Sequence, residues 1–179
     1  EELHHDRLEL GRQIGAAGYA VITGGGPGVM EAANSGAVDV GAHSVGIGIE
    51  LPHEQHLNHW VDLGINFRYF FARKTMFMKY SQGFVALPGG FGTLDELFEA
   101  LSWGLLGYHA KPVGLLDVGG YYCELVAFMD RMTASGFLRP QHRDNLVVAD
   151  EIGALLDRLG RHVMPPTVVD IVKGRGALP

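Results

Sequence analysis

The sequence is poor in the features that mark secreted, membrane-spanning and nucleic-acid-binding proteins. Cys123 is the only cysteine among 179 residues, which excludes an intrachain disulfide and a cysteine metal cluster. The apolar runs are short and interrupted by Gly or Pro, so no transmembrane helix and no membrane partner are expected. The net charge of −6 lacks the basic surplus of a nucleic-acid-binding protein, and we expect no nucleic-acid partner. The first residues show no signal-peptide pattern, and a cytoplasmic location is expected.

The composition is that of a globular protein. Hydrophobic residues make up 47% and charged residues 19% of the chain. Short apolar runs alternate with helical patterns, which is typical of a parallel sheet covered on both faces. We therefore predict an α/β protein with a Rossmann-like three-layer fold, a central parallel sheet and helices on both faces. Residues 1–179 are predicted to form a single nucleotide-binding domain, with the ligand beyond the carboxyl ends of the strands.

The apolar runs, and the Gly and Pro residues between them, predict where the strands and helices lie. Strands are predicted at residues 19–23, 44–49, 60–66, 83–87, 112–116 and 146–149. An opening helix is predicted to end near residues 15–18, and further helices at residues 29–40, 68–81, 93–106, 121–134 and 151–159. No element is predicted after Pro166.

Two glycine-rich corners join a predicted strand to a predicted helix. They are residues 23–30 (TGGGPGVM) and residues 87–96 (LPGGFGTLDE). Glycine permits close approach of the backbone to a ligand, and free amides at a helix start attract an anion. Glycines also make tight turns in any α/β protein, so the first corner alone does not decide between a turn and a ligand loop. Neither corner matches the dinucleotide fingerprint or the P-loop, which disfavours dinucleotides and triphosphates.

Thr93 and Glu96 have the T-x-x-E spacing of a capping box. In that interpretation Thr93 caps the helix, Glu96 reaches back to the amide of the cap, and Asp95 suits the dipole of the first turn. On spacing alone, the capping box is favoured over a ligand site.

The string Pro88-Gly89-Gly90-Phe91-Gly92-Thr93-Leu94-Asp95-Glu96 resembles the PGGxGTxxE motif of the LOG ("Lonely Guy") family. The first corner (GGGPGVM), the pair Arg73-Lys74 and the string KPVGLL at residues 111–116 resemble further parts of that family. Residues 64–80 (GINFRYFFARKTMFMKY) are most similar to its longer bacterial subgroup, formerly labelled lysine decarboxylase-like. LOG proteins are cytokinin riboside 5'-monophosphate phosphoribohydrolases.

The resemblance implies a metal-free hydrolysis, without a cofactor, of a nucleoside 5'-monophosphate such as AMP or a cytokinin riboside monophosphate. The products are the free base and ribose 5-phosphate. It implies a homodimer or higher homo-oligomer, with Arg73 and Glu96 as the catalytic pair. The phosphate is expected on Gly89, Gly90, Gly92 and Thr93. The nucleotide is expected to lie alongside Gly24, Gly25, Gly26, Gly28 and Met30.

Other constellations are weaker candidates. A metal is disfavoured at His53, His56 and His59, because their spacing fits no known site. Glu50 is a candidate second carboxylate, and a solvated acid at a strand end is an equal alternative. Lys74 as a Schiff-base lysine is disfavoured, since the chain offers no partner acid for a pyridoxal nitrogen.

The sequence is also compatible with a second function, and it differs from the family at one point. A non-catalytic nucleotide or cofactor carrier or sensor of the same superfamily is the alternative, as in the related molybdenum-cofactor carriers. Arg73 and Glu96 favour the enzyme, because a carrier needs only the anion-binding backbone. The family usually begins with a strand and a Gly-Ser-type loop that have no match here, so we expect the sheet to lack a central strand.

Overall fold

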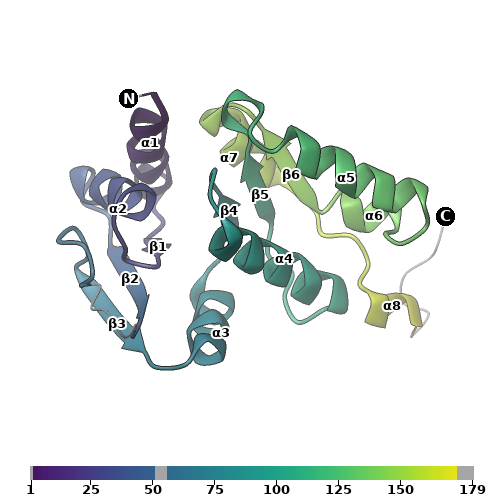
Figure 1. The fold of residues 1–179 in the computed structure, drawn as a ribbon, viewed down its shortest axis with the longest axis horizontal. Coiled ribbons are helices and arrows are strands. Elements are labelled where there is room, and N and C mark those ends of the chain that lie inside the picture. The colour runs from purple at the N-terminus through teal and green to yellow at the C-terminus, as the bar shows by residue number, and fades with distance from the viewer. Residues whose placement is uncertain (1, 51–55, 173–179) are drawn as a thin grey trace. The chain divides into compact units, whose positions relative to one another are not determined.

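The computed structural model describes residues 2–50 and 56–172. The chain forms two compact units, residues 1–81 and residues 82–179. The first unit contains α1 (Glu2–Ala16), β1 (Val21–Thr23), α2 (Val29–Asp39), β2 (Ser44–Ile49), β3 (Leu63–Phe67) and α3 (Phe70–Tyr80) (Figure 1). The second contains β4 (Phe84–Ala86), α4 (Phe91–Leu106), β5 (Val113–Leu116), the 3-10 helix η1 (Val118–Gly120), α5 (Cys123–Ala134), α6 (Pro140–Arg143), β6 (Leu146–Ala149), α7 (Ile152–Arg161) and α8 (Val168–Val172).

Each unit contains a parallel three-stranded sheet. The strand order is β1-β2-β3 in the first unit and β4-β5-β6 in the second. In the central strand β5, Val113, Leu115 and Leu116 have no exposed surface, as expected for a strand covered on both faces. Parallel pairing and alternation with helices confirm the predicted α/β class. The single domain stays a prediction. The registers align Val21 with Ser44, Val45 with Leu63, Phe84 with Val113, and Val113 with Leu146.

Helices α1 and α2 pack side by side at two glycines (Figure 1). A Cβ on Gly36 of α2 would overlap the carbonyl oxygen of Leu8, and one on Gly11 of α1 would overlap that of Ala33. The two backbones therefore approach more closely than any side chain would allow. Behind this contact, Val21, Ala33 and Ala37 form a buried cluster with Ile14 and Ala42.

The predicted elements are present, and their ends differ by a few residues. The most consequential difference is at α4, which begins at Phe91 rather than at Thr93. The tail contains the unpredicted α8, which starts beyond Thr167. The Thr167 side chain and amide bond the Asp170 carboxylate at 2.6 and 3.1 Å, and the Asp170 amide donates back to the Thr167 hydroxyl at 3.1 Å. This reciprocal pair is a capping box with Asp in place of Glu, a signature present in the sequence.

Across the part of the chain that the structure describes, every helix is too short or too polar to cross a bilayer.

The close contact of α1 with α2 predicts that Gly→Ala lowers stability at Gly36, whereas a control Gly→Ala substitution elsewhere raises it. Gly36→Ala is expected to lower the free energy of unfolding by about 1–3 kcal/mol, because the new methyl group meets backbone. Gly160→Ala in α7 is the control, since nothing lies within 4 Å of its Cβ position. It is expected to raise the free energy by about 0.5 kcal/mol through helix propensity. Urea unfolding of both variants tests this, and equal midpoints for Gly36→Ala and the parent would contradict the close contact.

Candidate functional site

The first glycine corner joins β1 to α2. Gly25 and Gly28 have φ of +71° and +72°, a backbone conformation that favours glycine. Gly28 is the N-cap of α2, and it has no side chain to accept from the first amides of that helix. Uncapped amides at a helix start are a site for an anion or for polar groups of a ligand.

A buried polar network holds this corner from the inside. Asn34 of α2 has no exposed surface; its side-chain oxygen accepts from Thr23 Oγ1 at 2.7 Å and from Asn58 Nδ2 at 3.1 Å. Its nitrogen donates to Ser44 Oγ at 2.8 Å. Thr23 Oγ1 in turn accepts from the Gly25 amide at 2.9 Å, and the Asn58 amide donates to the Gly25 carbonyl at 2.7 Å. Sequence reasoning missed Asn34 and Asn58; the one signal was an amide within an alanine-rich helix.

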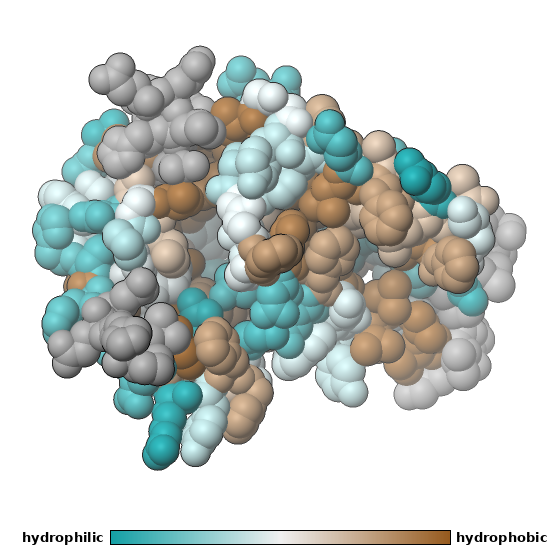
Figure 2. Space-filling model, viewed as in Figure 1, coloured by the Kyte–Doolittle hydropathy of each residue, from teal (hydrophilic) through white to brown (hydrophobic). Residues whose placement is uncertain are grey.

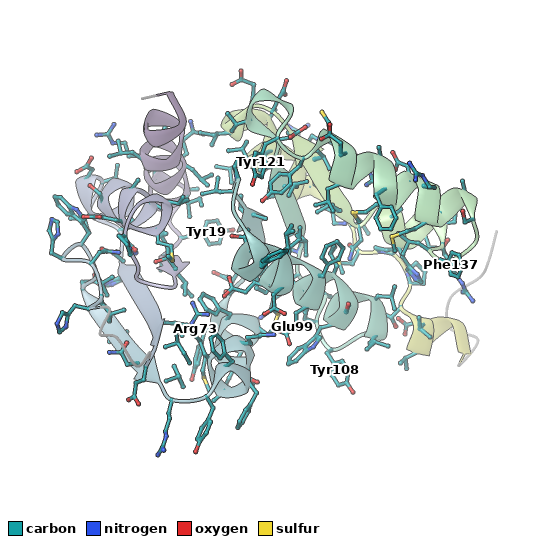
Figure 3. The ribbon with its side chains drawn as sticks, in the orientation of Figure 1. Tyr19, Arg73, Glu99, Tyr108, Tyr121 and Phe137 are labelled. Carbon is teal, nitrogen blue, oxygen red and sulfur yellow. The ribbon has the colours of Figure 1, made fainter. Side chains whose placement is uncertain are left out.

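Arg73 of α3 lies against the same corner. Its Nε donates to the Ile47 carbonyl of β2 at 2.7 Å, and its guanidinium lies 5.1 Å from the centre of the Phe77 ring. A Cβ on Gly24 would lie 2.5 Å from Arg73 Nη2 and 2.9 Å from Met30 Sδ. The first unit thus brings together three predicted site residues, Arg73, Gly24 and Met30; Figure 3 labels Arg73 on α3.

The second corner joins β4 to α4. Gly90 is the N-cap, with extended φ and ψ of −97° and −153°, and no side chain caps the helix. The predicted capping box is therefore wrong. Because α4 begins at Phe91, Thr93 and Glu96 lie inside the helix, and Asp95 lies beyond the first turn. Spacing alone could not show where the helix begins.

Two of the predicted phosphate-binding residues leave open backbone. Gly90 and Gly92 are exposed, and nothing lies within 4 Å of their Cβ positions. A Cβ on Gly89 would overlap Thr93 Oγ1, so the Thr93 hydroxyl lies over the Gly89 backbone. Glu96 is half-buried and lies three residues beyond Thr93, on the same face of α4. Arg73 and Glu96 belong to different units, and their catalytic pairing stays a prediction.

Two adjacent tyrosines reach the second corner from the segment before α5. Tyr121 Oη donates to the Gly89 carbonyl at 3.0 Å, and Tyr122 Oη donates to the Leu87 carbonyl at 2.6 Å. Burial raises the pKa of Tyr122, so its hydroxyl stays a donor at neutral pH. No local pattern predicted these contacts, because they join residues 32 and 35 positions apart.

The weaker candidates are not assembled into a site. Within residues 2–50 and 56–172, no cluster of three His, Cys, Asp or Glu side chains could hold a metal. His53 lies outside these residues; His59 Nδ1 lies 3.7 Å from a Glu31 oxygen. Glu50 is exposed beyond β2. Asp117 raises the pKa of the exposed Cys123 thiol, which disfavours a nucleophilic thiolate.

Comparison with known proteins identifies the family. A family model described as "Possible lysine decarboxylase" matches residues 30–159. The chain is 38% identical over 158 residues to a probable cytokinin riboside 5'-monophosphate phosphoribohydrolase of Oryza sativa subsp. japonica, covering 87% of this chain and 70% of that relative. An Arabidopsis thaliana cytokinin riboside 5'-monophosphate phosphoribohydrolase is 36% identical over 161 residues, covering 85% and 72%. The chain belongs to the LOG family.

A solved structure shares the fold of this LOG-family chain and has another role. The Moco carrier protein from Chlamydomonas reinhardtii superposes with a TM-score of 0.65 and 27% sequence identity, covering 89% of this chain and 86% of that chain. This likeness confirms the Rossmann-like α/β class. The fold alone therefore does not separate a LOG hydrolase from a carrier, and the choice depends on the site residues.

The polar network around Asn34 predicts that its loss destabilises the protein and loosens the first glycine corner. Asn34→Ala removes three side-chain hydrogen bonds and leaves buried partners unsatisfied, so the free energy of unfolding is expected to fall by about 1–3 kcal/mol. Amide exchange at Gly25 is expected to quicken, since Thr23 loses the partner that orients its hydroxyl. Ser35→Ala, one residue further along α2 and half-buried, is the control. Unchanged exchange at Gly25 in Asn34→Ala would show that the network does not hold the corner.

Proposed function

We propose that the chain hydrolyses the N-glycosidic bond of an adenine or cytokinin nucleoside 5'-monophosphate, giving the free base and ribose 5-phosphate. The observation that carries this proposal is its 36–38% identity, over 85–87% of the chain, to relatives named for that activity. Arg73 and Glu96 support it, because both catalytic positions of the family motif are retained. We further propose that the protein acts in the cytoplasm as a homodimer.

The phosphate is assigned to the start of α4. The backbone of Gly90 and Gly92 is open, the first amides of α4 have no side-chain cap, and the Thr93 hydroxyl is adjacent. A phosphate would satisfy these amides and would interact favourably with the positive end of the helix dipole. The phosphate is remote from the bond that breaks, so its binding energy positions the ribose.

The chemistry is assigned to Glu96 and Arg73. When the C1'–N bond breaks, its electron pair leaves with the base and positive charge develops on the sugar. The Glu96 carboxylate stabilises that charge or takes a proton from the attacking water, whose oxygen bonds to C1'; the base gains a proton. Arg73 is assigned to orient the carboxylate or to hydrogen-bond the departing base. As written, the reaction takes no metal and no organic cofactor.

The first corner is assigned to the rest of the nucleotide. Arg73 and Met30 both lie close to Gly24, so a ligand along Gly24, Gly25, Gly26 and Gly28 would lie next to the guanidinium. The polar network beneath this corner keeps its backbone fixed when a ligand is absent. Such preorganisation favours catalysis over loose binding.

The second candidate is a carrier that binds a nucleotide or cofactor without cleaving it. It is favoured by the likeness to the Moco carrier protein, with a TM-score of 0.65. The presence of Arg73 and Glu96 favours the hydrolase, since binding an anion needs only the backbone of the corners. Binding of AMP by the parent without release of base would favour the carrier.

The catalytic assignment predicts that Glu96→Gln lowers kcat for release of adenine from AMP, or of base from isopentenyladenosine monophosphate, by at least ~100-fold. Asp95→Asn is the matched control: it makes the same change of charge one residue earlier, at an exposed position on another face of α4. It is expected to retain activity within about two-fold. A chromatographic assay of free base measures the turnover of both variants. Turnover by Glu96→Gln equal to that of the parent would contradict the catalytic assignment.

Exposed aromatic residues on α3 support the homodimer. Phe70 and Phe71 are 54% and 72% exposed, and Tyr69 stacks on Phe71 with ring centres 5.6 Å apart. Figure 2 shows hydrophobic beside hydrophilic side chains over α3, and Leu63 and Ile65 of the edge strand β3 are also exposed. Apolar surface of this kind is typical of an interface between subunits.

The dimer proposal predicts that Phe71→Asp halves the mass of the protein in solution, because a charge would be buried without a partner. Light scattering after size exclusion gives the mass. Phe137→Asp, at an 86% exposed position after α5, is the control and is expected to keep the parent mass. An unchanged mass in Phe71→Asp would exclude α3 as the interface.

A further inference from the structure

We propose that Tyr121 and Tyr122 are positioning residues, which fix the peptide groups of residues 87–90 so that the Gly90 amide faces the bound phosphate. This inference rests on the proposed function, because it concerns the phosphate assigned to the start of α4. It adds two side chains that lie outside the family motif and touch neither the base nor the bond that breaks.

Each tyrosine holds one carbonyl of the loop. The hydroxyl of Tyr122 lies 2.6 Å from the Leu87 oxygen, and that of Tyr121 lies 3.0 Å from the Gly89 oxygen. The two rings meet edge to face, with centres 4.8 Å apart and planes at 86°. Tyr122 is 3% exposed and Tyr121 is 55% exposed, so one anchor is part of the core and the other lies at the surface. Figure 3 labels Tyr121 in the segment before α5.

The tyrosines are themselves fixed to the sheet of their unit. Asp117, the residue after β5, accepts from the Tyr122 amide at 2.6 Å through Oδ1. The Asp117 amide donates to the Ala149 carbonyl at the end of β6, at 2.8 Å. A continuous path of hydrogen bonds therefore runs from two strands, through Asp117 and the tyrosines, to the loop. The loop is held against a rigid part of the unit rather than against another loop.

Because a peptide unit is planar, a hydrogen bond that fixes its C=O also fixes the direction of the N–H of the next residue. The described peptides are trans, and in a trans peptide the C=O and the following N–H point in opposite directions. The Gly89 carbonyl shares its peptide with the Gly90 amide, so the bond from Tyr121 directs that amide away from Tyr121. The Leu87 carbonyl shares its peptide with Pro88, which has no N–H. Tyr122 therefore fixes the entry to the loop, and Tyr121 directs an amide.

The loop has little else to define it. Gly89 and Gly90 lack side chains, and glycine is the most permissive residue for the backbone. Gly90, the N-cap, has no side chain that could accept from the first amides of α4 and so fix its first turn. Amides that stabilise an anion must be oriented before it arrives, because reorganisation on binding weakens the interaction. The tyrosine hydroxyls supply that orientation.

Tyr121→Phe tests the proposal without disturbing packing, since the ring is kept and the lost bond is at the surface. In the full chain, the affinity for ribose 5-phosphate measured by calorimetry is expected to fall about 5- to 10-fold, the net worth of one hydrogen bond. The shift of the Gly90 amide resonance on addition of ribose 5-phosphate is expected to shrink. The Tm is expected to stay within about 1 °C of the parent, as for most surface substitutions. Tyr108→Phe, at a 76% exposed tyrosine after α4, is the control and should match the parent in all three measurements.

The outcomes separate this inference from the proposed function. Parent-like affinity and an unchanged Gly90 shift in Tyr121→Phe would overturn the positioning role, even if the parent cleaves AMP. A parent that neither binds ribose 5-phosphate nor releases base overturns the proposed function, and the inference with it. Tyr122→Phe supplies a second measurement: it is expected to lower Tm and affinity together, because its bond is buried. A drop in Tm alone would assign Tyr122 to stability only.

Discussion

Both glycine corners of this LOG-family chain depend on hydrogen bonds that reach their backbone from beneath. A glycine-rich loop cannot define its own shape, because it has no side chains to pack and its backbone is permissive. In the first corner, the Thr23 hydroxyl and the backbone and side chain of Asn58 bind the groups of Gly25 and Gly26. In the second, tyrosine hydroxyls bind the carbonyls of Leu87 and Gly89. The amides that remain are free to face a ligand.

The helices that follow the two corners have no side-chain cap, and the same holds for α3, α5, α6 and α7. α2 begins after Gly28 and α4 after Gly90, and neither N-cap offers an oxygen to the first amides. At Gly90, where φ is −97°, a Ser or Asp would stabilise the helix by only about a few tenths of a kcal/mol over Gly and would compete with an anion for the same donors. At Gly28, where φ is +72°, either side chain would be strained. The short helix α8 shows the contrasting case, since Thr167 and Asp170 satisfy its first turn.

The sequence predicted the local features of this structure and missed the distant ones. Apolar runs located the strands, and glycine strings located both corners, because each signal is contained in a few adjacent residues. The capping box at Thr93 and Glu96 was wrong: its spacing is correct, but α4 begins two residues earlier, at Phe91. The roles of Asn34, Tyr121 and Tyr122 could not be predicted, since their partners are 10 to 35 positions away. The phosphate ligands and the pairing of Arg73 with Glu96 stay predictions.

Gly24 differs from Gly25 and Gly28, because its φ is not positive and its backbone would accept other residues. A Cβ on Gly24 would lie 2.5 Å from Arg73 Nη2, so the guanidinium would have to shift to make room for a side chain there. The two positions lie 49 residues apart in the chain and are constrained by one steric contact. In the evolution of related chains they should therefore change together: a lineage that gains a side chain at the first position must give up or relocate the arginine. Under the proposed function, a change at Gly24 would then reach the chemistry through the position of Arg73.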